Sequence, residues 1–436
     1  MHKEAQELID FINNSPTAFH ATQNLETELS ANGFIKLDPS QKWDLKIGEK
    51  YFVSRNDSAL IAFIPGQDFL DHGFRIISAH TDSPALKIKP DPLIENEGQL
   101  VLNTEIYGGP ILNTWYDREL SIAGKIVLKS EKSFELKEEL IDLEKNIAII
   151  PNLAIHLNRE INQKAKINKK KGLRALITQT KAKENNLAEK DELDFSLNKL
   201  ITQNTEYELT EIVESELYLY PSQRAQFLGA EAEYIAARAQ DNLSMTHAAL
   251  KAIKSSKTHK WTQMTIFYDN EEIGSQTPQG ADSPFVSNLI ERIIYNLGAN
   301  KEDYYTILEK SFLVSADMAH AVHPNFGEES AQNNRAFLNQ GPVIKYNANL
   351  KYTTHATTAG VLIDLMDKND ISYQIYTNRS DKKGGSTIGP IAATQLGIKS
   401  IDLGNPLLAM HSSRELGGSL DHKQMIKLMK LFLKED

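Results

Sequence analysis

Short apolar runs that end in polar clusters recur along this chain of 436 residues. Each run is rich in β-branched and aromatic residues, and stretches with helical periodicity separate one run from the next. Continuous apolar runs of this kind are typical of strands that are buried on both faces by helices. The pattern therefore predicts an α/β fold, with strands at Phe74–Ser78, Met264–Tyr268, Ser311–Ser315 and Ile398–Leu403.

The pattern changes in the middle of the chain. Gln99–Ile106 and Tyr207–Tyr220 alternate apolar and polar residues like half-buried strands. We therefore expect residues 93–234 to form an inserted β-rich domain, and residues 1–92 and 235–436 to form one discontinuous domain.

Both ends of the chain have helical patterns. We predict helices at Phe11–Ala31 and Ser419–Lys434 that pack on the core. The second has one apolar stripe with the spacing of a helix face, formed by Met425, Leu428, Met429 and Phe432.

Composition excludes several classes of protein. The chain has no cysteine, which excludes disulfides, thiolate metal sites and a cysteine nucleophile. It has 48 Lys and Arg against 58 Asp and Glu, so its net charge of −10 disfavours nucleic acid as the main partner. No apolar run approaches the roughly 18 residues of a membrane span, and the first residues read as an amphipathic helix and not as a signal peptide. We expect a cytoplasmic protein.

Ionisable side chains follow the predicted strands. His80 and Asp82 come after the first, Glu271 and Glu272 after the second, and Asp317 after the third. His411 follows the fourth by a short loop, and Asp241 precedes a helical stretch.

Taken singly, these residues have ordinary explanations. They include a surface pair for His80 and Asp82, a helix N-cap for Asp241 or Asp317, a solvated acidic turn at Glu271, and a structural role for His411. Their joint placement points elsewhere, because the carboxyl ends of strands in an open α/β sheet meet at one crevice where ligands bind. That much negative charge in a crevice requires a counter-charge, which divalent cations supply.

The charges balance for a pair of metal ions. Two divalent ions and three carboxylates leave a charge of +1, which a bridging hydroxide brings near neutrality. Mixed imidazole and carboxylate ligands suit Zn²⁺, with Mn²⁺ or Co²⁺ as substitutes. The sequence therefore favours a two-metal hydrolytic site.

Other catalytic templates are absent from the sequence, including GxSxG, HExxH, GxxxxGK[ST] and GxGxxG. The glycine-rich stretch Gly384–Gly389 could present backbone N–H groups to an anion or substrate, or could form a turn between a strand and a helix.

The combined motifs resemble the M18 family of metalloaminopeptidases, and most closely its aspartyl aminopeptidase type. The resemblance runs from Phe11 to the last helix and is weakest from Gln163 to about Leu209. It rests on SAHTDSPALKIKP, GGPILNTWYDREL, AARAQDNLS, YDNEEIGSQTPQGADS, SADMAHAVHPN, GPVIKYNAN and LAMHSSRE.

This resemblance implies a fold and an assembly. The fold is a doubly wound, mixed-sheet α/β metallopeptidase domain, interrupted by a β-rich domain that helps to build a tetrahedral dodecamer.

The resemblance also implies roles for individual residues. His80 and Asp317 would bind one metal, Glu272 and His411 the other, and Asp241 would bridge the two. Glu271 would be the general base, Asp82 would orient His80, and His156 would approach the active site of a neighbouring subunit. His320 and Lys345 match positions in the substrate pocket.

The implied activity is that of a zinc aminopeptidase that prefers acidic N-terminal residues, with Lys345 as the local counter-charge. A bridging hydroxide would attack the peptide, with Glu271 moving its proton. Two alternatives stay open. One is a carboxypeptidase or amide deacylase with the same metal core, and the other is a non-catalytic scaffold.

Overall fold

The computed structural model describes residues 3–132, 134–164, 166–180, 196–208 and 210–435. The chain divides into two compact units. The first unit comprises Met1–Ser83, Ala225–Met410 and Arg414–Asp436, and the second comprises Pro84–Arg224 with His411–Ser413. The domain boundaries that we expected from the sequence stay a proposal.

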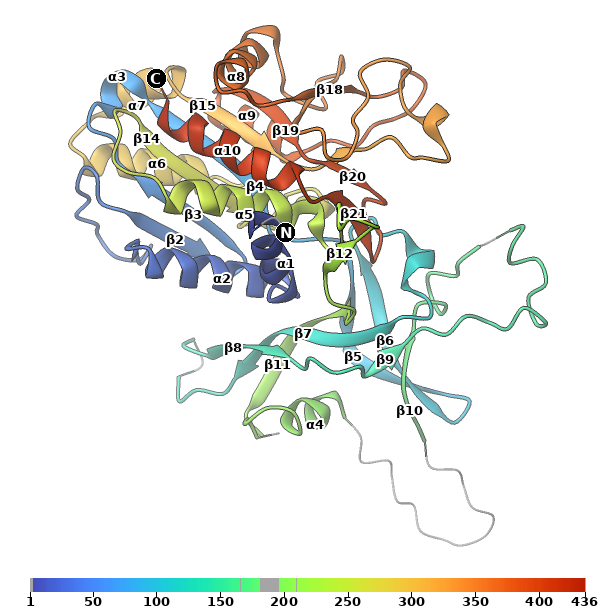
Figure 1. Ribbon diagram of the computed structural model, residues 1–436. Coiled ribbons are helices and arrows are strands. Elements are labelled where there is room, and N and C mark those ends of the chain that lie inside the picture. Colours follow the sequence, from blue (N-terminus) through green and yellow to red (C-terminus); the bar gives the residue numbers. More distant parts are fainter. Residues whose placement is uncertain (1–2, 133, 165, 181–195, 209, 436) are drawn as a thin grey trace, which may run out of the picture. The chain divides into compact units, whose positions relative to one another are not determined.

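A mixed sheet forms the centre of the first unit, and it has nine strands within the described residues (Figure 1). Both parallel and antiparallel neighbours occur in it. In spatial order the strands are β1 (Ile35–Lys36), β2 (Tyr51–Arg55), β3 (Ala59–Ile64), β14 (Thr262–Tyr268), β4 (Phe74–His80), β15 (Phe312–Ala316), β19 (Lys399–Gly404), β17 (Val343–Tyr346) and β18 (Gln374–Thr377).

The four apolar runs singled out in the sequence are neighbouring strands of this sheet. Strands β14, β4, β15 and β19 are adjacent and parallel, which confirms the predicted α/β sheet. Tyr268 is paired in register with His80, and Ser78 with Ser315. The polar residues that follow these strands therefore leave the sheet at the same edge.

Helices cover both faces of the sheet, which explains why its strands are apolar throughout. Ile77 and Ala79 of β4 face one core, and Phe74 and Ile76 face the other. The first core contains residues of α1 (Lys3–Asn13), α2 (Ala18–Ala31), α5 (Gln240–Lys254), α8 (Ala356–Lys368) and α10 (Asp421–Lys434). The second contains residues of α3 (Phe69–His72), α6 (Phe285–Asn296), α7 (Lys301–Glu309) and α9 (Ile388–Leu396).

The N-terminal helix prediction was wrong in one respect. Phe11–Ala31 is not one helix, because α1 ends at Asn13 and α2 begins at Ala18. Pro16 lies in the break, where it has no N–H to donate and disfavours helical geometry at the residue before it. The C-terminal prediction is confirmed by α10, which buries the predicted apolar stripe.

A smaller sheet of five strands, counted within the described residues, completes the first unit. Its order is β12 (Gln226–Leu228), β13 (Tyr234–Ala237), β21 (Glu415–Gly418), β20 (Pro406–Leu408) and β16 (Ala319–His320). Two short 3₁₀ turns, η2 (Glu271–Ile273) and η3 (Gly327–Glu329), also belong to this unit.

The second unit is built on antiparallel strands. Strand β11 (Ile212–Pro221) pairs with both β5 (Ala85–Asn96) and β7 (Glu119–Leu128), so the sheet closes into a ring. The strand predicted at Tyr207–Tyr220 corresponds to β11, which begins only at Ile212. Residue 209 lies outside the described part of the chain. The ring is completed by β6 (Gln99–Tyr107), β10 (Ala175–Gln179) and β9 (Ala148–Ile149), with β8 (Lys137–Asp142), η1 (Leu112–Trp115) and α4 (Leu197–Thr202) added to it.

None of the helices in the described part of the chain combines the length and the apolar character needed to cross a bilayer.

Candidate metal centre

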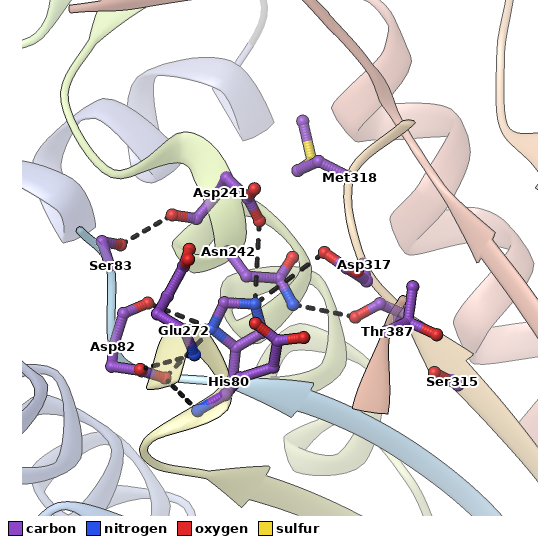
Figure 2. A network of polar contacts seen from close by, with 12 residues as sticks. His80, Asp82, Ser83, Asp241, Asn242, Glu272, Ser315, Asp317, Met318 and Thr387 are labelled. Carbon is purple, nitrogen blue, oxygen red and sulfur yellow. Dashed lines mark hydrogen bonds and ion pairs between the residues drawn. The ribbon is translucent and has the colours of Figure 1, made fainter. Parts of the chain in front are cut away.

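His80 is the last residue of β4 and its side chain is buried, with 1% exposure. Its Nδ1 lies 3.2 Å from Asp82 Oδ1 and 3.0 Å from the Asp82 carbonyl oxygen. Its Nε2 lies 3.7 Å from Asp241 Oδ1 and 3.8 Å from Asp317 Oδ1 (Figure 2). Asp82 thus holds one side of the imidazole, and the other side faces two carboxylates from different segments.

Asp241 lies in the first turn of α5 but does not act as the helix N-cap. Its backbone departs from helical geometry, with φ −83° and ψ 104°, and Ala239 occupies the N-cap position. The Asp241 N–H donates to Glu415 Oε2 at 3.1 Å, and the Asp241 carbonyl accepts from Ser83 Oγ at 2.6 Å. These contacts replace helical ones and fix the segment beside His80.

Asp82 also positions the Glu271–Glu272 turn that follows β14. The Glu271 N–H donates to Asp82 Oδ1 at 3.2 Å, and the Glu272 N–H donates to Asp82 Oδ2 at 3.1 Å. Asn270 begins this turn in the left-handed region, with φ 60°. One buried carboxylate therefore organises the ends of two neighbouring strands.

His80, Asp241 and Glu272 each offer a ligand atom, and these atoms all lie within 4.8 Å of one another. Two ligand atoms of one tetrahedral zinc ion, each bonded at about 2.0–2.2 Å, lie about 3.3–3.6 Å apart. The separations of 3.7 Å and 3.8 Å from His80 Nε2 to Asp241 and Asp317 are only slightly longer. The nitrogen and oxygen donors therefore fit a divalent transition metal.

The electrostatics of the cluster also favour a cation. Burial opposes a charge on His80, but Asp317 and Asp82 outweigh burial and raise its pKa well above the ordinary value. Burial, with a contribution from Asp317, Asp82 and Asp241, raises the pKa of Glu271 to about 8, although His80 opposes this. Nearby carboxylates raise both pKa values, but burial is the larger cause for Glu271 and opposes the shift of His80.

Lys345 compensates Asp317 on the other side of the cluster. Lys345 Nζ lies 3.5 Å from Asp317 Oδ2 and donates to the carbonyl oxygens of Asp317 and Met318 at 2.8 and 3.1 Å. Burial would raise the pKa of Asp317, but Lys345 and then His80 lower it well below its ordinary range. Lys345 is only 1% exposed. Its ammonium, expected in the substrate pocket, thus contacts a predicted metal ligand.

The structure brings together His80, Asp82, Asp241, Glu271, Glu272, Asp317 and Lys345 from the predicted set. His320 ends β16 with an exposed side chain, and its ring centroid lies 6.1 Å from that of Tyr376. His156 and His411 belong to the second unit, where His411 Nδ1 lies 3.1 Å from the Gly109 carbonyl oxygen. Their predicted roles at the metal centre and across a subunit interface stay predictions.

Three supporting residues were missed by the sequence reasoning. Ser83 and Glu415 hold the backbone of Asp241, and Thr246 Oγ1 donates to the His80 carbonyl oxygen at 2.7 Å. Ser83 and Glu415 lie inside two of the motifs quoted above, but a motif does not reveal that a side chain will bind the backbone of a distant segment. Nothing in the sequence distinguishes Thr246.

A family profile described as "Aminopeptidase I zinc metalloprotease (M18)" matches residues 11–433. A curated relative, the "Probable M18 family aminopeptidase 2" of Clostridium novyi, is 44% identical over 432 residues, which span 99% of this chain and 98% of the relative.

Solved structures agree with this match. The chain is similar to one in a cryo-EM structure of the Ape4 and Nbr1 complex, with a TM-score of 0.93, 34% identity, and coverage of 99% of this chain and 85% of that one. It is also similar to a chain of the S. cerevisiae mApe1 dodecamer, with a TM-score of 0.84, 27% identity, and coverage of 99% and 97%. The chain therefore belongs to the M18 family and is a metal-dependent aminopeptidase.

Proposed function

We propose that this protein removes the N-terminal residue of peptides with two divalent ions, most simply Zn²⁺, held by His80, Asp241, Glu272, Asp317 and His411. The observation that carries the proposal is the cluster in which His80 Nε2 faces Asp241 and Asp317, with a ligand atom of Glu272 in η2 within 4.8 Å of those of His80 and Asp241. Asp241 lies close both to His80 and to Glu272, which are assigned to different ions, and is therefore suited to bridge the two.

The ions, when bound, would lower the pKa of a water and polarise the scissile carbonyl. Glu271 takes a proton from the attacking water and later passes it to the leaving amine. Asp82 keeps both His80 and the Glu271 turn in place, so that base and ligands share one anchor.

A reconstitution assay tests this proposal. Chelator-treated protein would be loaded with Zn²⁺, Mn²⁺ or Co²⁺ and assayed on peptide amides with Asp, Glu, Leu, Lys or Ala at the N-terminus. We expect two ions per chain, activity only after loading, and no cleavage of N-acetylated peptides. Turnover of acetylated peptides would favour a carboxypeptidase or deacylase, and one ion per chain at full activity would contradict a dinuclear site.

We extend the proposal to a preference for acidic N-terminal residues, which the resemblance to aspartyl aminopeptidases supports. Lys345 is the cation assigned to that preference, and its Nζ already lies 3.5 Å from Asp317. An acidic substrate side chain would therefore share Lys345 with Asp317. Lys345→Met should lower kcat/KM for Asp and Glu substrates more than for Leu. An equal loss for every substrate would leave Lys345 as a partner of Asp317 alone.

We also propose that the protein forms a homo-oligomer, because the similar mApe1 chain was solved as a dodecamer. Leu153, Ile155 and Leu157 are exposed around His156, and Leu157 is 74% exposed. Exposed apolar patches of this kind mark interaction sites. A second copy that covers this segment would bring His156 to a neighbouring active site.

Light scattering can test this assembly with Leu157→Asp, and Leu70→Asp on α3 serves as the exposed control. We expect dissociation and loss of activity with retained metal in the first variant only. A fully active monomer would exclude the role of His156 across an interface.

A further inference from the structure

The carboxylate of Asp402 is fully buried in the middle of the first unit's sheet. Asp402 is paired in register with Ser315 on β15, two residues before Asp317. Its Oδ1 accepts from Ser315 Oγ at 2.9 Å and from Thr387 Oγ1 at 2.5 Å. Its Oδ2 accepts from the Thr353 N–H at 2.7 Å and from Thr353 Oγ1 at 2.8 Å. We call Ser315, Thr353, Thr387 and Asp402 the Asp402 cluster.

The cluster ties the glycine-rich loop to the sheet. Thr387 ends this loop and caps α9, with its Oγ1 accepting from the Gly389 N–H at 3.3 Å. A Cβ at Gly389 would lie only 2.4 Å from Asp402 Oδ2, so glycine is what allows the carboxylate to approach. The loop is further held where Ser386 Oγ donates to the Lys351 carbonyl oxygen at 3.3 Å. Gly385, directly before these anchors, is exposed.

The same cluster leads to Asp317 by two routes. Along β15, Ser315 precedes Asp317 by two residues. Through the Thr353 segment, the neighbouring Tyr352 places its ring 5.2 Å from Lys345 Nζ, which contacts Asp317. Figure 2 shows Thr387 and Ser315 in the same neighbourhood as Asp317. A displacement of Asp402 would therefore displace Asp317 and Lys345, which lie on the proposed substrate side of the metal centre.

We infer that Asp402 is a positioning residue, which fixes the glycine-rich loop and the Thr353 segment against β15, the strand that Asp317 follows, and thereby sets where the substrate main chain lies. The inference rests on the proposed function, because it assigns this loop to the substrate side of the proposed metal centre. Small misplacements of substrate are costly in catalysis, since about 1 Å can cost on the order of a hundredfold in rate.

The hydrogen-bond chemistry supplies a matched control. Asparagine at position 402 can put its carbonyl oxygen where Oδ2 lies, so that the Thr353 N–H and hydroxyl still donate to it. Its NH₂ group then replaces Oδ1, and the hydroxyls of Ser315 and Thr387 can turn to accept. Asp402→Asn should therefore preserve the cluster, whereas Asp402→Ala removes it.

Two readouts on metal-loaded enzyme test the inference. We expect Asp402→Ala to raise KM for the best peptide amide about tenfold or more at unchanged metal content, and Asp402→Asn to stay close to wild type. The second readout is tryptic cleavage under native conditions after Lys382 and Lys383, which are exposed just before the loop. Cleavage should accelerate in the alanine variant and not in the asparagine variant.

Wild-type KM and cleavage in a folded Asp402→Ala protein would overturn the inference, as would equal damage in Asp402→Asn. If the alanine variant does not fold, Thr387→Val against Thr387→Ser gives the same comparison at the loop, because serine keeps the hydroxyl. A wild-type protein that cleaves no peptide would sink the proposed function, while the protease readout would still decide whether the loop is anchored through Asp402.

Discussion

Among the buried histidines of the first unit, His80 and the pair formed by His247 and His422 have pKa values that are shifted in opposite directions. His80 lies at the edge of the sheet among carboxylates, and its pKa is raised well above the ordinary value. His247 on α5 and His422 on α10 are also buried, with His247 Nδ1 2.8 Å from His422 Nε2. Burial and the charge of Lys251 lower the pKa of His422 to about 3, and burial lowers that of His247 well below its ordinary value.

The difference lies in the neighbours and not in burial. Desolvation is the largest single influence on each of these three histidines, and it always opposes the charged form. Only His80 has aspartates close enough to reverse it, at 3.2 to 3.8 Å. The neighbouring carboxylates therefore distinguish His80, the proposed metal ligand, from the His247–His422 pair, in which burial favours the neutral imidazoles.

The largest loss of activity should follow from a change at Glu271, the proposed general base beside His80. Glu271→Gln removes proton transfer but keeps the shape of the turn, so kcat should fall about 10²- to 10⁴-fold. Metal content, measured by mass spectrometry, should stay at the wild-type value. Glu309→Gln, on the exposed face of α7, is the matched control and should keep full activity. Unchanged turnover in Glu271→Gln would remove Glu271 as the base.

A smaller effect is expected when the carboxylate that holds His80 is neutralised. Asp82→Asn weakens the contact with His80 Nδ1 and leaves one of the two turn amides facing an NH₂ group. Loss of such a supporting carboxylate typically weakens metal binding about 10- to 100-fold. Competition with a chelator measures this affinity, and Asp71→Asn, at an exposed ion pair, is the control. Wild-type affinity in Asp82→Asn would mean that His80 needs no such partner.

The smallest effect concerns the neutral pair. Because the folded-state pKa of His422 is about 3 and the unfolded value is about 6.5, the unfolded chain binds a proton first as the pH falls. The stabilising contribution is therefore fully present above about pH 6.5 and is lost progressively down to about pH 3. His422→Gln removes this proton uptake, so between pH 7.5 and 5.5 its loss of unfolding free energy should be smaller than that of wild type by about 1 kcal/mol.

Denaturant titrations at several pH values measure that difference. Burial raises the pKa of the neighbouring Asp421 to about 6, which acts in the opposite direction below that pH. Asp421 is present in both proteins, so the comparison cancels it. The same pH slope in His422→Gln and wild type would mean that His422 already carries a proton when folded.

The sequence could predict the four central strands because each is apolar on both faces, and it could predict that His80 and Asp317 lie at the carboxyl ends of two of them. His80 and Asp317 needed only that adjacency rule. The break at Pro16 was signalled by the proline itself, and the long amphipathic pattern on either side obscured it. The contacts of Lys345 and Asp402 could not be predicted, because the partners of a buried charge depend on which segments, here 15 to 87 residues apart, the fold brings together. The His247–His422 pair likewise depends on the crossing of two helices.

Asp82 has a consequence for the protein without its metal. It bonds the imidazole at the end of β4 and two amides almost 190 residues further along the chain. Because these hydrogen bonds are made by the chain's own atoms, we expect the ligand atoms to lie close together before ions bind. We expect metal ions to leave and rebind such a centre without a change in the surrounding backbone. Chelator-stripped enzyme should recover its activity at the rate at which ions enter, without passing through a refolding step.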